Sequence, residues 1–325
     1  MSSSTRRSPP TLAVAVALLI VYVVWGSTYL GIAIMIETMP PLLSAGVRYG
    51  MAGLIMLGVI LAHARLTGTR FEAPTRGQWV AAFITGTLLL LGGNGGVVLA
   101  ELLIPSGVAA VLIATVPIWL AVFDSIATRR RPSGLVIGGL VAGLIGVVIL
   151  LAPVEGIGRL DPLGVALCLG AAISWAIGSL YGRGAAMRTG NFGSGMTMFA
   201  GGMALVVVAA VIGEVGQVDL GAISIRSWVA FGYLVVFGSV VAFTAYTWLL
   251  ANVSVSTVGT YAYVNPIVAV VLGAIILGEP ITPRTLIAAA IIIGAVVAMV
   301  SGRPREAEEP GPSPDAATLE PRQSR

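Results

Sequence analysis

Long uncharged runs dominate the pattern of hydrophobic and polar positions along this chain of 325 residues. Each run is long enough for one membrane-crossing helix, because about 20 apolar residues span the hydrocarbon core of a bilayer. Seven such runs lie between successive charged residues, at 8–36, 77–100, 102–123, 132–154, 162–182, 189–213 and 285–302. The pattern therefore predicts a series of transmembrane helices rather than a water-facing fold.

Two further stretches complete the series. The run 227–278 is long enough for two helices and has a polar break at 252–256, while 42–64 is apolar except for Arg48 and His63. We predict an all-α integral membrane protein, because lipid cannot satisfy backbone hydrogen bonds and the two-residue alternation of a β-barrel is missing. The ten predicted transmembrane helices are 12–35, 42–63, 77–99, 105–127, 134–152, 162–182, 190–213, 227–250, 256–278 and 283–301.

Composition agrees with lipid as the main solvent. The chain is 57% hydrophobic and 10% charged, whereas soluble domains carry about 25% charged residues. Arg6 and Arg7 precede the first apolar run, but that run is too long for the core of a signal peptide. We predict that residues 1–10 are a cytoplasmic N-terminal segment, and that the polar tail 302–325 is disordered and cytoplasmic.

Arginine placement predicts the orientation. With a cytoplasmic N-terminus, three arginines fall in outer loops, and Arg48 lies inside a helix. This is a strong positive-inside bias, and it places both termini in the cytoplasm. The net charge of +4 therefore serves membrane topology, and we predict no nucleic-acid partner. The inner segments hold Arg6, Arg7, Arg65, Arg70, Arg76, Arg129, Arg130, Arg131, Arg183, Arg188, Arg303, Arg305, Arg322 and Arg325.

A weak internal repeat divides the chain into segments 11–153 and 161–301. Trp25 with the following Gly-Ser and Tyr returns around Trp175, and the Pro117 region returns around Pro266. Five spans in each half mean that the second half enters from the opposite side. We therefore predict two inverted five-helix repeats, the architecture associated with alternating access in secondary transporters.

Arg48 is the most informative charge, because a cation inside a span is costly unless it is paired or hydrated. It could bind a substrate carboxylate, or it could form a structural ion pair for which Glu101 is the obvious partner. Glu101, at the outer end of the third span, could also act as a protonation switch. Asn94 lies in the glycine-rich stretch 92–96, which we predict to be thin and bent, and its amide should face a partner or a wet cavity.

Other candidates for the substrate pathway are aromatic or polar positions inside the spans. Pro117 and Pro266 each remove a backbone hydrogen bond, so we predict helix kinks there. The freed carbonyls could contact a solute or be satisfied by a neighbouring helix. The aromatic side chains could line a cavity for small amphipathic solutes, or simply pack between helices. These further pathway candidates are Trp25, Tyr29, Thr115, Trp175, Tyr261 and Asn265.

With these segments together, the chain resembles the drug/metabolite transporter superfamily with two EamA domains, and within it the exporters of the YedA type. The resemblance covers about residues 20–280 and implies ten helices and export of small metabolites or toxic compounds. The matching segments are 25–29 (WGSTY), 40–42 (PPL), 45–48 (AGVR), 93–95 (GNG), 100–101 (AE), 105–110 (PSGVAA), 114–117 (ATVP), 174–176 (SWA), 260–266 (TYAYVNP) and 278–279 (GE).

We therefore expect a secondary transporter in a bacterial plasma membrane, which exports amino-acid-like or drug-like solutes by alternating access. Its partners would be a small-molecule solute, the lipid bilayer and, as one candidate coupling ion, protons. One Cys and one His leave no multi-histidine metal site, and no phosphate-cradling loop is present, so no metal, cofactor or direct use of ATP is expected. The alternatives are a membrane-embedded enzyme, or a structural membrane protein without transport.

Overall fold

The computed structural model describes residues 10–69, 71–129, 134–151, 160–188, 190–253, 258 and 260–301. Within these ranges every element is a helix, which confirms the predicted all-α class. The elements are α1 (Thr11–Ile20), η1 (Val21–Trp25), α2 (Gly26–Met35), α3 (Pro41–Thr67), α4 (Arg76–Gly86), η2 (Thr87–Gly95), α5 (Gly96–Ala100), α6 (Ser106–Ile113), α7 (Val116–Ala127), α8 (Gly134–Leu151), α9 (Pro162–Gly184), α10 (Gly190–Val211), η3 (Glu214–Gln217), α11 (Ile225–Tyr233), η4 (Leu234–Val241), α12 (Ala242–Asn252), α14 (Tyr261–Leu272), η5 (Gly273–Leu277) and α15 (Pro283–Ser301).

Several elements join end to end into membrane-length helices. In the described part of the chain, seven helices are long and apolar enough to cross a bilayer, and three more apolar helices are shorter. The seven are Thr11–Met35, Pro41–Thr67, Arg76–Ala100, Ser106–Ala127, Pro162–Gly184, Gly190–Val211 and Ile225–Leu249; the shorter three are Ile137–Ile149, Val264–Leu277 and Pro283–Ala298. The chain is therefore a multi-pass membrane protein, and the count of ten spans stays a prediction.

Local sequence explains how the helices begin. Thr75 forms a capping box with Gln78, in which each side chain accepts a hydrogen bond from the other residue's backbone N–H. Ser224 caps α11 through the backbone N–H of Ser227. Asp161 caps α9 through the N–H of Leu163. Each cap satisfies a donor that the first helical turn leaves free.

Two Gly-Glu pairs fasten the starts of α3 and α6. Gly213 and Gly278 both adopt a left-handed conformation, which suits the residue that follows a helix. Each glycine turns the next residue, a glutamate, toward another helix. Glu214 accepts hydrogen bonds from the N–H groups of α3 at 3.3 and 2.7 Å, and Glu279 accepts from those of α6 at 2.8 and 3.1 Å. A carboxylate at a helix N-terminus is also favoured by the helix dipole.

Glycines bring the central helices into close contact. A Cβ atom at Gly202 of α10 would lie 2.4 Å from the backbone nitrogen of Gly50 in α3, and one at Gly201 would lie 2.5 Å from the carbonyl oxygen of Gly86 in α4. Small residues of this kind let backbones pack closely inside a membrane. As a result α10 packs along both α3 and α4.

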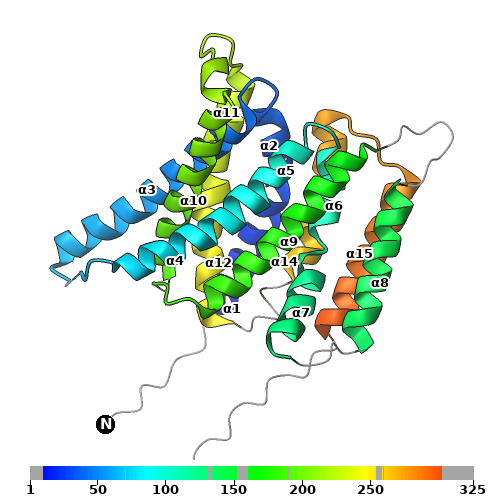
Figure 1. Cartoon of the computed structure of the whole chain (residues 1–325), viewed down its shortest axis with the longest axis horizontal. Helices are drawn as coiled ribbons and strands as arrows, with labels where there is room; N and C mark the ends of the chain where they lie inside the picture. Colours follow the sequence, from blue (N-terminus) through cyan, green and yellow to red (C-terminus); the bar gives the residue numbers. More distant parts are fainter. Residues whose placement is uncertain are drawn as a thin grey trace, which may run out of the picture.

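The helices form an elongated bundle with one separate pair at its edge (Figure 1). That pair is α8 and α15, which pack along each other. We call the end of the bundle where α2 ends and α11 begins the upper end, as it lies in Figure 1, and the opposite end the lower end. Large apolar side chains such as Leu12, Val211 and Ile225 stay exposed on the outside, where lipid would cover them.

Candidate functional site

Arg48 of α3 lies in the interior, with only 3% of its surface exposed. Its Nε donates a hydrogen bond to Ser239 Oγ at 3.1 Å, and its guanidinium carbon lies 4.5 Å from the centre of the Tyr49 ring. A Cβ atom at Gly238 would come within 3.2 Å of Nη2, so the glycine makes room for the guanidinium. Among the described residues no carboxylate lies within ion-pair distance of Arg48, so the predicted pairing with Glu101 is not present there; the ion pair that occurs joins Arg226 to Glu37.

The first helix, α1 through α2, bonds to the end of α11 and to η4 near Ser239. Trp25 Nε1 donates to the carbonyl oxygen of Gly238 at 3.2 Å, and Ser27 Oγ lies 2.6 Å from the hydroxyl of Tyr233. Three helices therefore meet around one buried cation, and two of them carry π-helical segments, η1 and η4. Such segments leave carbonyls outside the regular ladder and are frequent at functional sites. We call this set the Arg48 cluster: Trp25, Ser27, Arg48, Tyr233, Gly238 and Ser239.

An aromatic group lies next to the Arg48 cluster. The Trp25 ring contacts Phe243 at 5.4 Å, Tyr246 at 4.9 Å and Tyr261 at 5.2 Å between centroids. These rings come from the first helix, α12 and α14, so the predicted pathway residues Trp25 and Tyr261 are brought together. Aromatic walls beside a cation can hold a solute with an apolar body and a polar end.

Asn265 braces α14 against the first helix. With the amide oriented so that its nitrogen faces two carbonyls, it donates to Tyr22 at 3.2 Å and to Tyr261 at 3.1 Å. The Tyr22 hydroxyl also bonds Thr260. The buried Asn265 side chain therefore links α14 to the first helix.

Trp175 belongs to a different contact, beside the residue that precedes Asn94. Asn94 lies in η2, and Trp175 of α9 packs on the neighbouring Gly93, where a Cβ atom would lie 2.9 Å from the ring. Ser174 Oγ donates to the carbonyl of Leu88 at 2.7 Å. The glycine-rich stretch predicted to be bent is part of a π-helical segment, and it accepts the α9 side chains.

The two predicted kink prolines behave differently. Pro117 lies in the first turn of α7, and the fourth helix divides just before it, at Ala114 and Thr115. The buried Thr115 hydroxyl donates to the carbonyl of Leu112 at 2.7 Å, which satisfies one acceptor at the division. Pro266 lies inside the continuous helix α14.

Glu101 follows α5 at the upper end. Both of its carboxylate oxygens are enclosed by protein, and neither accepts a hydrogen bond from any described residue. Tyr29 of α2 is in electrostatic range of Glu101. It packs against two apolar clusters, one with residues of α3, α10 and η4 and the other with residues of α6, α8, α9 and α15. These two predicted pathway residues therefore lie near each other. Glu101 is too far from Arg48 to form an ion pair with it.

Hydrogen bonds and an ion pair join the end of α2 to the start of α11 at the upper end. Thr38 Oγ1 donates to Ser227 Oγ at 2.9 Å, and Ser227 Oγ donates to the carbonyl of Ile34 at 2.8 Å. The carboxylate of Glu37 lies 3.6 Å from the guanidinium of Arg226. This upper contact holds the end of α2 against the start of α11.

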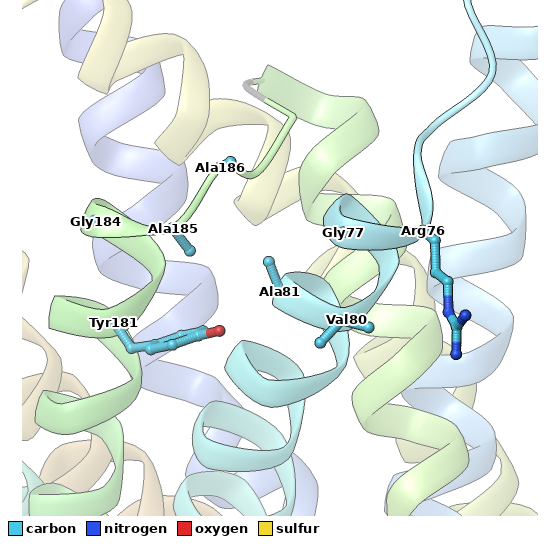
Figure 2. Close-up of a pocket in the computed structure, with 8 residues that line it drawn as sticks. All are labelled: Arg76, Gly77, Val80, Ala81, Tyr181, Gly184, Ala185 and Ala186. Carbon is cyan, nitrogen blue, oxygen red and sulfur yellow. The ribbon is translucent and has the colours of Figure 1, made fainter.

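At the lower end, by contrast, the start of α4 and the end of α9 are separated. A cavity of about 660 Å³ separates the start of α4 from the end of α9. Figure 2 shows the Tyr181 ring pointing from α9 toward α4, while the Arg76 side chain points away from it. The lining residues are Arg76, Gly77, Val80, Ala81, Tyr181, Gly184, Ala185 and Ala186.

Sequence reasoning missed several members of these groups. Gly238, Ser239 and Tyr246 lie in a run that reads simply as an apolar span, although a small Gly-Ser pair at mid-helix was a signal for a close approach. Among the described residues no group of three or more His, Cys, Asp or Glu side chains could hold a metal ion.

Known proteins resemble this chain over nearly all of its helical part. The model of the EamA-like transporter family matches twice, at residues 12–152 and 162–301. The "Uncharacterized inner membrane transporter YedA" of Escherichia coli strain K12 is 39% identical over 292 residues, which is 88% of this chain and 90% of that protein.

Two other comparisons are more distant. The "Threonine/homoserine exporter RhtA" of Escherichia coli strain K12 is 31% identical over 199 residues, 59% of this chain and 61% of that protein. A solved structure titled "Crystal structure of protein" superposes with a TM-score of 0.59 at 19% identity, and covers 89% of this chain and 96% of its own. At that identity the superposition shows a shared fold and nothing about the solute.

Proposed function

Because this chain belongs to the EamA-like transporter family, we propose that it is a secondary transporter that exports small amino-acid-like or drug-like solutes. That it is a membrane transporter follows from the family and from its apolar helices. Alternating access through a central cavity between the two halves is our proposal for the mechanism. The amino-acid class draws on the distant relative named as a threonine and homoserine exporter.

One observation carries the proposal: a buried arginine without a carboxylate at the meeting point of three helices. A buried cation is costly unless something compensates its charge. Arg48 donates one hydrogen bond to Ser239 and has no acidic partner in the described residues. A solute carboxylate would supply the missing negative charge, and the Trp25 aromatic group would hold the solute's apolar part.

The spacing of equivalent features supports two inverted repeats. The caps Thr75 and Ser224 lie 149 residues apart, and so do Ile36 and Ala185, which end α2 and α9. The π-helical segments η2 and η4 follow the same spacing to within three residues. The packed pairs α3–α10 and α8–α15 each join one helix of segment 11–153 to one helix of segment 161–301.

The unequal ends of the bundle support alternating access. Under the repeat, the Glu37–Arg226 pair at the upper end corresponds to Ala186 and Gly77, which line the lower cavity. The corresponding pairs of helix ends are therefore bonded at the upper end and separated at the lower end. An exchange of these two arrangements would open the upper end and close the lower one.

We further propose ten spans in a bacterial inner membrane, with the lower end and both termini in the cytoplasm. The three shorter apolar helices would complete the seven long ones, and the arginine distribution supports the orientation. The terminal segments 1–10 and 302–325 lie outside the described residues, apart from Pro10.

Transport by the purified chain in proteoliposomes tests the proposal. Counterflow of radiolabelled L-threonine, L-homoserine and a panel of other amino acids should show saturable exchange. Replacing Arg48 by Gln should lower kcat/KM by roughly 100-fold, since losing a buried charge contact costs about 2–5 kcal/mol. The matched control is Arg65→Gln, an exposed arginine of the same helix, which should exchange like the wild type.

Equal exchange by the Arg48→Gln variant would remove the carboxylate-binding role. Absence of exchange by the wild type, across amino acids and drug-like solutes, would favour the two alternatives, a membrane-embedded enzyme or a structural protein.

A further inference from the structure

Besides Glu37, which pairs with Arg226, three described glutamates at the upper end contact their surroundings in different ways. Glu214 and Glu279 each accept hydrogen bonds from two backbone N–H groups at the start of a helix. Glu101 accepts none from the described residues, although both of its oxygens are enclosed by protein. One carboxyl group at this end therefore lacks the donors that the other two have.

The charged and titratable groups around Glu101 do not compensate it. They are Tyr29 of α2, Arg48 of α3, Cys168 of α9 and Glu279 after η5, each from a different element. Arg48 bonds Ser239 and forms no ion pair with Glu101, and the Glu279 carboxylate is occupied at α6. Tyr29 and Cys168 are neutral and form no hydrogen bond to it.

An enclosed carboxylate without donors is unstable in its charged form, whereas the protonated acid is tolerated. Glu101 lies just beyond the spanning helix Arg76–Ala100. Burial raises the pKa of its carboxyl group well above the usual range; the negative charge of Glu279 adds to the rise and Arg48 opposes it. Water entering through an opened upper end would restore the charged form. The closed upper end therefore binds one proton more than the open one, and lower pH favours closure.

We propose that Glu101 is the proton-binding site that couples solute export to proton entry. This rests on the proposed transport function and identifies its coupling group. Glu101 takes up a proton from the outer side, and its neutral form lets the upper end close. Solute that binds from the lower side displaces this proton to the lower side, and the charged carboxylate then favours reopening of the upper end. Antiport requires only that solute and proton do not occupy the protein together.

Infrared spectroscopy of the purified full chain tests the protonation without any solute. The wild type near neutral pH should show the C=O stretch of a buried protonated carboxyl group. Glu101→Gln should lose this band, and Asp124→Asn, which changes an exposed carboxylate of α7, should keep it. Gln mimics the neutral acid in shape, so the variant should unfold thermally at or above the wild-type temperature. An unchanged spectrum in Glu101→Gln overturns the proposal.

Proteoliposomes test the coupling. An inward proton gradient should drive net L-threonine efflux by the wild type and by Asp124→Asn, and Glu101→Gln should lose this gradient-driven efflux. Gradient-driven efflux that persists in Glu101→Gln overturns the proton role. A wild type that keeps the infrared band but moves no solute contradicts the transport function instead.

Discussion

The carboxylate of Glu279 occupies a space that only a glycine at position 273 leaves open. A Cβ atom there would lie 2.5 Å from Oε2. The Glu279 N–H donates to the carbonyl of the same Gly273 at 3.2 Å, after the left-handed turn at Gly278. The end of one helix is thereby shaped to deliver a charge to the start of another, α6.

Replacing Glu279 by Gln should destabilise the protein by about 1–2 kcal/mol, because the amide keeps one acceptor and loses the charge-assisted bonds to Ser106 and Gly107. Denaturation of the purified protein in detergent measures the change. Asp219→Asn, at a carboxylate that bonds Gly221 in an exposed loop, is the control and should change little. Equal stability of the two variants would contradict the capping role.

At this scale the sequence predicts which residues are unusual but not what they contact. Arg48 stands out because a charge interrupts an apolar run, and it is buried as expected. Its predicted partner Glu101 lies at the outer end of the third predicted span, whereas the observed partner, Ser239, lies 191 positions away. A hydroxyl in an apolar helix carries no local sign that a distant arginine will reach it.

Helical elements differ from the prediction mainly in their interior. The predicted span 162–182 nearly coincides with α9, and 77–99 with the helix from α4 through α5, because charges and caps mark these ends. The π-helical segments η1, η2, η4 and η5 were not predicted. A side chain from another helix packs on one of these segments, the Trp175 ring on Gly93, and no hydrophobic period encodes such a contact.

The upper contact should behave as a gate between α2 and α11. A disulfide between cysteines at positions 38 and 227, whose hydroxyls lie 2.9 Å apart, should stop solute exchange when oxidised and release it on reduction. The buried Cys168 should not interfere, because it is enclosed by the core.

The single variants Thr38→Cys and Ser227→Cys serve as controls and should exchange under both conditions. Full exchange by a completely cross-linked double variant would show that these helix ends need not separate.

For the whole molecule, the distribution of arginine predicts which side of the membrane each terminus occupies. A fluorescent protein fused after Arg325 should mature and fluoresce, and alkaline phosphatase fused there should stay inactive, because the C-terminus is expected in the cytoplasm. Fusions at the N-terminus should give the same result. Opposite results at the two ends would require an odd number of spans and would remove the inverted repeat.

The class of the molecule was predictable from the sequence because it depends on composition and run length, which are local. The difference between the bonded upper end and the open lower end was not predictable, since it depends on how closely particular pairs of residues approach each other. Glu37 and Arg226 are widely separated in the chain, and each reads as an ordinary loop charge. The cavity opposite them is lined by small residues such as Gly77 and Ala186, which give no signal of open space.

The two Gly-Glu pairs have a consequence for how the earlier and later parts of the chain assemble. Both carboxylates belong to the later part of the chain, and both helix starts they hold, those of α3 and α6, belong to the earlier part. Two identical copies of the earlier part would have no such anchors. The two parts of the chain are therefore not interchangeable: separately expressed pieces should assemble as one of each kind, and neither should replace the other.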